Sequence, residues 1–203
     1  MLLVFGLSAF FRTVGEGVFH CQACGGDRGY RRRIGRRWFT LFFLPVIPLD
    51  RLGEIVECHT CRARFRPAVL RLPTADQLTA ALSAGMRAAV ALVLRAGVEG
   101  DEAARRRAVE AVRGYGEEYY DDEALEGDLG MPAAFLAEEI VPAGAHLAVE
   151  AKEWFLARAV RVGLADGPLT ERERQTLRDV AGHLGMTHAH ALGVIAMTEG
   201  AAR

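Results

Sequence analysis

Two hydrophobic patterns divide the 203-residue chain near residue 72. Before that point, large apolar and aromatic residues occur in short runs separated by glycine, proline and arginine, which is typical of strands and turns. After it, apolar residues recur at helical spacing, which is typical of amphipathic helices. The sequence therefore predicts an α+β protein with two domains, a small β-rich domain at 1–72 and an all-helical domain at 73–203.

The first domain is expected to contain three strands, Leu2–Phe5, Trp38–Phe43 and Glu54–Glu57. Two apolar stretches, one at the start of the chain and one at Trp38–Leu49, are shorter than the ~20 residues of a membrane-spanning helix. The first of them also lacks the basic region and cleavage site of a signal peptide. We interpret both as strands of a buried sheet and expect no transmembrane segment and a cytoplasmic protein, with contact at a membrane surface as the alternative.

The second domain is expected to contain six helices. Thr74-x-x-Gln77 and Thr170-x-x-Glu173 match the capping box that begins many helices, and each precedes an apolar periodic run. Pro132 suits a first helical turn. The predicted helices cover 75–96, 101–113, 132–141, 144–163, 170–184 and 187–199, with glycines expected at three C-terminal ends, Gly97, Gly163 and Gly185.

A weak internal repeat lies within these helices. The segment Leu94–Gly100 resembles Val160–Gly167, and the glycines Gly97 and Gly163 are 66 positions apart. Each copy lies between a long apolar helix and a charged one. Two helix–loop–helix units that pack face to face are therefore expected.

Charge is distributed unevenly between the two parts. Residues 1–72 carry 12 arginines against 5 acids, a net +7, whereas residues 73–203 carry 13 basic residues against 21 acids, a net −8. Six arginines fall in one segment, expected to be the exposed arm of a hairpin, and aromatic residues accompany them. This composition suits a nucleic-acid surface; the alternatives are a solvated hairpin or a docking face for the acidic helices. The arginines are Arg28, Arg31, Arg32, Arg33, Arg36 and Arg37.

The four cysteines form two Cys-x-x-Cys pairs, Cys21 with Cys24 and Cys58 with Cys61. Two such pairs supply the four thiolates of a tetrahedral zinc site. Because four cysteines fill every position around the metal, the zinc is expected to be structural rather than catalytic. His20 and His59, which flank the pairs, are interpreted as surface residues.

Carboxylates suggest a second cation site. Asp166 and Glu173 flank the turn that begins a helix, where they are positioned to hold calcium or magnesium. The alternative is local: Glu173 belongs to a capping box, and acids near a helix N-terminus favour its dipole. The acidic run Glu117–Glu123 is interpreted as a solvated connection between helices, with a second cation surface or an arginine-docking face as the alternative.

The common catalytic motifs are missing from the sequence. It contains no phosphate-binding loop, no Gly-x-Ser-x-Gly and no His-Glu-x-x-His. The histidines near the C-terminus, His183, His188 and His190, are interpreted as surface residues. We therefore expect a protein that is not an enzyme.

The helical half resembles the TerB domain of bacterial tellurite-resistance and related proteins. The resemblance rests on Ala165-Asp166-Gly167-x-Leu169-Thr170-x-x-Glu173 and the following helix, and it extends over about residues 76–200. That family has two helical repeats with Asp-Gly turns and is thought to bind metal through their acids. Asp166 and Glu173 match the motif, but the first copy departs from it, with Glu99 in place of Asp and Arg106 in place of the second Glu.

The N-terminal part resembles a zinc-ribbon segment of small bacterial proteins, some of them fused to TerB-like domains. The resemblance rests on the two cysteine pairs and on the string Thr40–Pro48 between them. Together the resemblances imply a zinc-binding scaffold or adaptor with protein partners in a stress-response complex. Nucleic-acid binding through the arginine segment and docking on a membrane or partner through Trp38–Leu49 are the alternatives.

Overall fold

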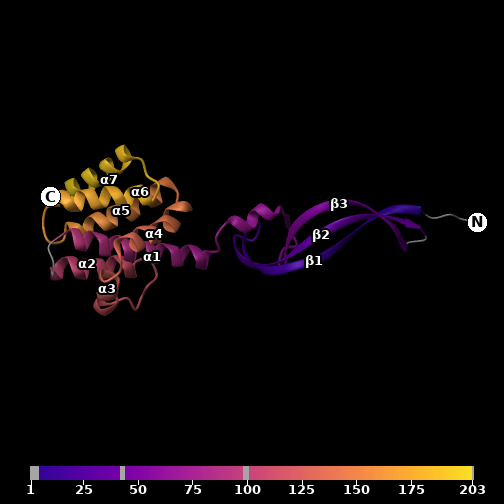
Figure 1. The fold of residues 1–203 in the computed structure, drawn as a ribbon, viewed down its shortest axis with the longest axis horizontal. Coiled ribbons are helices and arrows are strands. Elements are labelled where there is room, and N and C mark those ends of the chain that lie inside the picture. The colour runs from indigo at the N-terminus through magenta and orange to yellow at the C-terminus, as the bar shows by residue number, and fades with distance from the viewer. Residues whose placement is uncertain (1–4, 42–43, 98–100, 203) are drawn as a thin grey trace, which may run out of the picture. The chain divides into compact units, whose positions relative to one another are not determined.

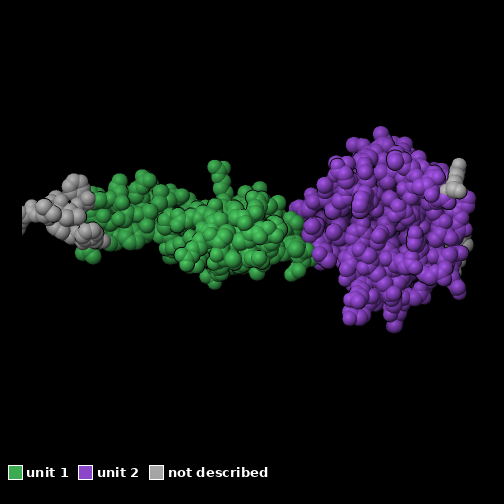
Figure 2. Space-filling model, turned by 180° about the vertical axis from the view of Figure 1, so that it is seen from behind, with its two compact units in different colours: residues 1–76 green, residues 77–203 purple. Residues whose placement is uncertain are grey.

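The computed structural model describes residues 5–41, 44–97 and 101–202. Contacts group the chain into two compact units, Met1–Asp76 and Gln77–Arg203, coloured green and purple in Figure 2. An antiparallel sheet forms the first unit and helices form the second, so the predicted α+β class is confirmed. The predicted domain boundary and the helical repeat stay predictions.

Three long strands run side by side in the first unit (Figure 1). They are β1 (Phe5–Cys21), β2 (Gly26–Leu41) and β3 (Leu44–Cys58), and the two-residue strand β4 (Arg64–Phe65) joins the edge of β3. β2 and β3 extend far beyond the predicted segments Trp38–Phe43 and Glu54–Glu57. Of the predicted strand Leu2–Phe5 only Phe5, the first residue of β1, is among the described residues, and residues 42 and 43 of the second prediction also lie outside them. The expectation for β2 was too short because nine of its 16 residues are glycine or arginine, which carry no strand signal of their own.

A small core lies at the end of the sheet that carries the cysteines. Phe19 and Val56 are buried there, and Phe19 contacts Tyr30 and Phe65 edge-to-face at centroid distances of 5.5 and 5.6 Å. The short 3₁₀ helix η1 (Pro67–Arg71) adds partly buried apolar side chains to this cluster. Elsewhere in the sheet, the described residues form no second buried cluster of this kind.

In its described residues, the second unit contains seven helices. The predicted starts and ends of three helices, 75–96, 101–113 and 170–184, agree with the structure to within one residue, and the other three predicted helices are present with shifted ends. One helix, α3, was not predicted. The helices are α1 (Ala75–Ala96), α2 (Glu102–Arg113), α3 (Asp122–Leu129), α4 (Ala133–Ala145), α5 (Val149–Gly163), α6 (Glu171–His183) and α7 (His188–Ala201).

Helix α1 is the central helix of the bundle. Met86, Val90 and Val93 are fully buried in it, and they join a core that includes Phe155 and Leu177. The segment Pro67–Ala96 is long and apolar enough to cross a membrane by length and composition, with a mean hydropathy of 1.5. A buried central helix has the same properties, so this segment is weak evidence for a membrane span.

The helix ends bear out some capping predictions. Thr170 and Glu173 form the reciprocal capping box at the start of α6. Gly185 follows α6 with a φ of +71°, the left-handed conformation that glycine adopts without steric cost. Gly163, in contrast, is the last residue inside α5, and Leu164 takes the cap position. Pro132 precedes α4 rather than lying in its first turn.

Candidate functional site

The two cysteine pairs meet at one end of the sheet. Their four sulfur atoms lie within 4.8 Å of one another, and the Cys21 and Cys61 sulfurs are 3.8 Å apart. Four thiolates at about 2.3 Å from a tetrahedral zinc ion would be separated by about 3.8 Å. The spacing therefore suits a tetrahedral metal ion. Among the described residues, no other cluster of three or more metal-ligating side chains is present.

Both pairs lie in tight turns built by the backbone. After Cys21 at the end of β1, the N–H groups of Cys24 and Gly25 donate to the carbonyl of Cys21, at 3.1 and 2.9 Å. Gly25 has a φ of +66°, which glycine adopts without strain. After Cys58 at the end of β3, the N–H of Arg62 donates to the Cys58 carbonyl at 3.1 Å. The two turns present similar thiol positions from strands on either side of β2.

The four thiols differ in burial and in pKa. Cys21 and Cys58 are buried, Cys24 is half-buried and Cys61 is exposed. Burial raises the pKa of Cys58, but the N–H groups of Cys61 and Thr60 and neighbouring thiols outweigh it and lower that pKa to about 7. Contact with Cys61, followed by burial, raises the pKa of Cys24 to about 12. Backbone N–H groups aimed at the Cys58 sulfur favour its thiolate, the form that binds metal.

The flanking histidines lie outside this cysteine cluster. The Nδ1 of His20 is 3.2 Å from a carboxylate oxygen of Asp27, and His59 is exposed. The other carboxylate oxygen of Asp27 accepts the N–H of Ala75 at 2.7 Å, at the start of α1. His20 and Asp27 thus serve the local structure around the cysteines.

The arginine segment lies in β2, the strand between β1 and β3, and not in an exposed arm as expected. Arg31 and Arg33 are half-buried and lie 3.5 and 3.0 Å from the buried carboxylate of Glu57. Arg32 pairs with Glu54 at 2.6 Å. Burial raises the pKa of Glu57, but Arg33 and its neighbours outweigh this effect and lower it overall. These three arginines are largely compensated by acids of β3.

The other three arginines of the segment are exposed. Arg28 donates to a backbone carbonyl, and Arg36 lies over the ring of Trp38 at 5.8 Å. Arg37 and Arg36 lie toward the far end of the sheet from the cysteines. The segment thus does not present six arginines on one surface, because neighbours along a strand face opposite sides of the sheet.

The far end of the sheet carries exposed apolar side chains. We call its described residues 6–12, 34–41 and 44–53 the ribbon tip. Phe39 pairs across β2 and β3 with Ile47, and Trp38 pairs with Pro48. The exposed fractions of Leu7, Leu44 and Val46 are 63, 68 and 54%, and Phe10, Ile47, Leu49 and Leu52 are exposed as well. Both apolar runs were expected to be strands of a buried sheet, with membrane contact as the alternative. Their burial was wrong, because many of the described apolar side chains of β1 and β3 are exposed here.

The carboxylates of Asp166 and Glu173 lie on the same side of Gly97. A Cβ atom built on Gly97 would be 2.7 Å from Glu173 Oε1 and 3.8 Å from Asp166 Oδ2, and one built on Gly163 would be 3.5 Å from Glu173 Oε1. The glycines of both repeat copies therefore flank one buried carboxylate. The Oε2 atom of Glu173 accepts from Thr170. Two carboxylates are fewer than the six to eight oxygens that calcium takes, and this cation site stays a prediction; Glu99 lies outside the described residues.

The acidic run has local partners and begins a helix. Glu117 accepts from the hydroxyl of Ser83, and Asp121 caps α3. Asp122 pairs with Arg105 at 2.8 Å. The interpretation as a solvated connection was wrong from Asp122 onward, because these acids stabilise the N-terminus of α3 and its contact with α2.

The C-terminal histidines differ from one another. His183 and His188 are exposed, as expected. His190 is half-buried, and its Nε2 lies 2.5 Å from a carboxylate oxygen of Glu153 on α5. This contact joins α7 to α5.

Comparison of the chain with family models, with curated proteins and with solved structures gives no match.

Proposed function

We propose that this protein is a non-enzymatic zinc-binding scaffold or adaptor of the TerB-like kind. The observation that carries the proposal is the convergence of Cys21, Cys24, Cys58 and Cys61 at the spacing of a tetrahedral thiolate site. Four cysteines leave no ligand position for water or substrate, so the ion holds the sheet together and performs no chemistry. Such a site requires reduced thiols, which is consistent with a cytoplasmic protein.

The helical unit would supply the protein contacts of the adaptor. Its support is the Asp166-Gly167 turn followed by the Thr170–Glu173 capping box, the part of the TerB-like pattern that occurs in this chain. We infer partners in a stress-response complex from that resemblance. A divalent cation held by Asp166 and Glu173 is part of the same proposal and would need further oxygen ligands.

Metal analysis tests the zinc site directly. The purified protein is expected to contain one zinc per chain by elemental mass spectrometry, and Cys58→Ser is expected to lose it. His59→Ser is the matched control, because His59 is exposed and adjacent to the cysteine pair but is no ligand. A protein without metal, or a Cys58→Ser variant that retains it, would contradict the proposal.

A second candidate function, docking on an anionic membrane surface, is favoured by the ribbon tip. Trp38 and exposed aliphatic side chains lie there beside four arginines, and Asp50 is the single acid among its residues. Tryptophan beside arginine is typical of segments at the membrane interface. The four arginines are Arg12, Arg36, Arg37 and Arg51.

The pairing of β2 with β3 gives this candidate a further argument. Arg36 lies directly opposite Arg51, and like charges opposite each other destabilise a sheet. Lipid phosphates would offset that repulsion. Pro45 and Pro48 lie on β3, where they oppose the addition of a strand from a second copy. Because open sheet edges do not occur in hydrocarbon, the contact would be shallow.

Vesicle flotation tests the membrane candidate. The protein is expected to float with phosphatidylglycerol vesicles and not with phosphatidylcholine vesicles, and Ile47→Ser with Leu44→Ser is expected to abolish flotation. Leu192→Ser, an exposed leucine on α7, is the matched control. Absence of flotation with both lipids would exclude this candidate and leave the zinc site unaffected.

The nucleic-acid alternative has less support. Arg31, Arg32 and Arg33 are paired with Glu54 and Glu57, which lowers the positive charge available to phosphates. In a filter-binding titration, we expect no nucleic-acid binding that weakens both with added salt and in the variants Arg32→Gln and Arg37→Gln. Retention that falls with salt and in both variants would restore this alternative.

A further inference from the structure

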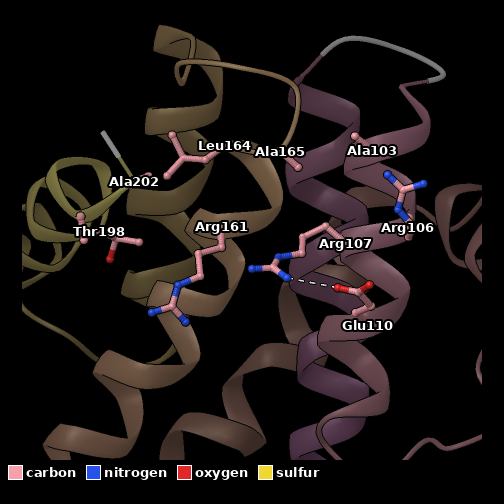
Figure 3. Close-up of a pocket in the computed structure, with 10 residues that line it drawn as sticks. Ala103, Arg106, Arg107, Glu110, Arg161, Leu164, Ala165, Thr198 and Ala202 are labelled. Carbon is pink, nitrogen blue, oxygen red and sulfur yellow. Dashed lines mark hydrogen bonds and ion pairs between the residues drawn. The ribbon is translucent and has the colours of Figure 1, made fainter.

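An arginine-lined groove crosses the helical unit between α2, α5 and the end of α7 (Figure 3). A cavity of about 580 Å³ is lined by Arg106, Arg107, Glu110 and Arg161, and an adjoining cavity of about 200 Å³ by Arg107, Glu110, Arg158 and Arg161. The two cavities share three lining residues and form one feature, which we call the arginine groove. It is distinct from the cysteine cluster and from the ribbon tip.

The arginines of this groove are exceptional within an acidic unit. Residues 77–203 carry 13 basic residues against 20 acids, so carboxylates are in excess. Most described arginines of the unit accordingly contact a carboxylate or a backbone carbonyl, as Arg105 and Arg174 do. Four described arginines have neither kind of contact. Three of them, Arg106, Arg158 and Arg161, line the groove, and the fourth, Arg172, lies elsewhere on α6.

The groove arginines differ in exposure and in the groups they contact. Arg161 and Arg106 are exposed, and Arg158 lies over the ring of Tyr115 at 5.5 Å. The side chain of Arg107 extends from α2 into the space between α2 and α5, on the side where Arg161 lies (Figure 3). It holds the one acid of the groove, Glu110, at 3.1 Å. Three guanidinium groups thus remain without a carboxylate.

The walls of the groove decide between classes of anion. The planar guanidinium group of arginine matches the geometry of carboxylates and of phosphates equally well. The described residues that line the groove include Ala103, Leu164 and Ala165 but no aromatic ring on which a nucleotide base would stack. Small apolar walls between arginines suit aliphatic side chains that alternate with carboxylates.

We propose that the arginine groove binds an acidic peptide segment of a partner protein. Carboxylates of the peptide pair with Arg161, Arg106 and, in exchange with Glu110, Arg107. Its apolar side chains pack on Leu164 and the neighbouring alanines. The site belongs to the helical unit alone, so it depends neither on the metal nor on the ribbon tip.

Fluorescence anisotropy on the full-length protein tests this proposal. The probe is a labelled peptide of alternating Glu and Leu, and we expect saturable binding that weakens as salt is added. Arg107→Gln with Arg161→Gln is expected to weaken binding at least about tenfold. Arg172→Gln removes one positive charge from an exposed site outside the groove and is expected to leave the affinity unchanged, whereas Arg161→Gln, which removes one charge within the groove, is expected to weaken it.

A second pair of variants tests the role of Glu110. Glu110→Gln frees Arg107 and is expected to tighten binding, whereas Glu138→Gln, which removes an exposed acid on α4, is expected to have little effect. Equal effects of the two substitutions would reduce the interaction to net charge and overturn the groove. Binding that survives Arg107→Gln with Arg161→Gln would also overturn it, as would tripolyphosphate binding in the groove without peptide binding.

Discussion

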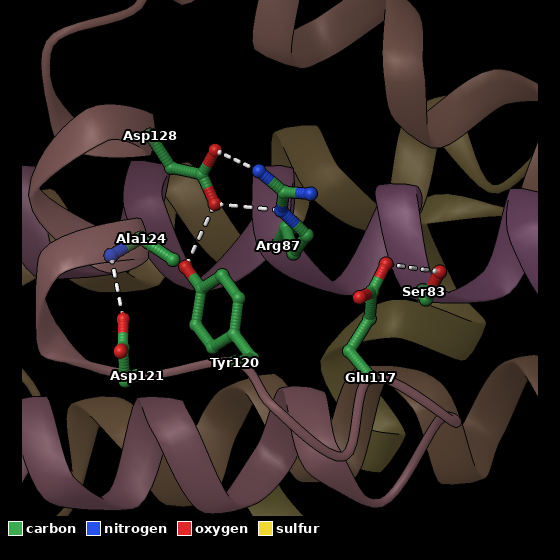
Figure 4. A network of polar contacts seen from close by, with 7 residues as sticks. All are labelled: Ser83, Arg87, Glu117, Tyr120, Asp121, Ala124 and Asp128. Atoms are coloured by element: carbon green, nitrogen blue, oxygen red, sulfur yellow. Dashed lines mark hydrogen bonds and ion pairs between the residues drawn. The ribbon is translucent and has the colours of Figure 1, made fainter.

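The carboxylate of Asp128 accepts hydrogen bonds from both Nε and Nη2 of Arg87, at 2.8 and 2.7 Å (Figure 4). The hydroxyl of Tyr120 donates to the same carboxylate at 2.7 Å, and the Arg87 guanidinium lies over the Tyr120 ring. Asp128 is buried near the end of α3, and Arg87 lies in the middle of α1. This network therefore attaches the short helix α3 to the central helix.

Removal of the Asp128 carboxylate is expected to destabilise the helical unit. Asp128→Ala leaves Arg87 and the Tyr120 hydroxyl without their acceptor, and we expect the free energy of unfolding to fall by about 2–3 kcal/mol. The partial exposure of Arg87 keeps the loss below that of a fully buried pair. Urea denaturation followed by circular dichroism measures the change. Glu138→Ala, at an exposed acid, is expected to change stability by less than about 0.5 kcal/mol.

Tyr120 makes the stability of the same unit sensitive to alkaline pH. Burial, followed by the hydrogen bond to Asp128, raises the pKa of Tyr120. A raised pKa in the folded state gives stability that is complete below the ordinary tyrosine pKa of about 10 and is lost as pH rises above it. Tyr120→Phe is expected to lower the free energy of unfolding by about 1 kcal/mol near neutral pH. The stability of this variant is expected to fall less steeply than that of the wild type as the pH rises into the alkaline range. Denaturation curves at neutral and alkaline pH give the free energy of unfolding at each pH. An equal loss of stability with rising pH in the wild type and in Tyr120→Phe would contradict this prediction.

The sequence predicted features whose cause is local. The spacing of Cys21, Cys24, Cys58 and Cys61 sufficed for the cysteine cluster, because two short turns place four thiols together whatever the strands between them do. The capping box of Thr170 and Glu173 likewise marked the start of α6, because its hydrogen bonds join residues three positions apart.

Features that depend on distant residues were missed. Helix α3 is held by Arg87, 41 positions from Asp128, so its acidic sequence alone resembled a connection. The middle of β2 was not predicted because arginines have little strand preference; Glu54 and Glu57 of β3 compensate them only after pairing. The arginine groove arises where α2 packs against α5, which no short motif records.

Two glycines of the helical unit are expected to respond oppositely to alanine. A Cβ on Gly144 would lie 2.5 Å from the backbone oxygen of Leu184, whereas one on Gly193 of α7 would meet open space. Gly144→Ala is therefore expected to cost about 2–3 kcal/mol, since backbone must move. Gly193→Ala is expected to stabilise by about 0.5–1 kcal/mol through helix propensity. Thermal denaturation of both variants checks the pair, and a Gly144→Ala protein as stable as the wild type would contradict the packing.

Metal removal is expected to affect the sheet and leave the helices folded. Among the described residues, the fully buried part of the cluster around the cysteines consists of Phe19, Cys21, Val56 and Cys58, with a few partly buried side chains against it, too few to offset the entropy of ordering the sheet. Binding of the ion is thus expected to supply much of the folding free energy of the first unit.

The helices have their own core around Met86 and Phe155, which contains no cysteine. A strong chelator is therefore expected to broaden the amide signals of residues 5–72 in a two-dimensional NMR spectrum and to leave those of α1–α7 in place. Cys58→Ser should reproduce this pattern without chelator, and His59→Ser should not. If the signals of the sheet remain dispersed after the metal has been removed completely, the ion is no structural element of this protein and the four thiols must be assigned to redox chemistry.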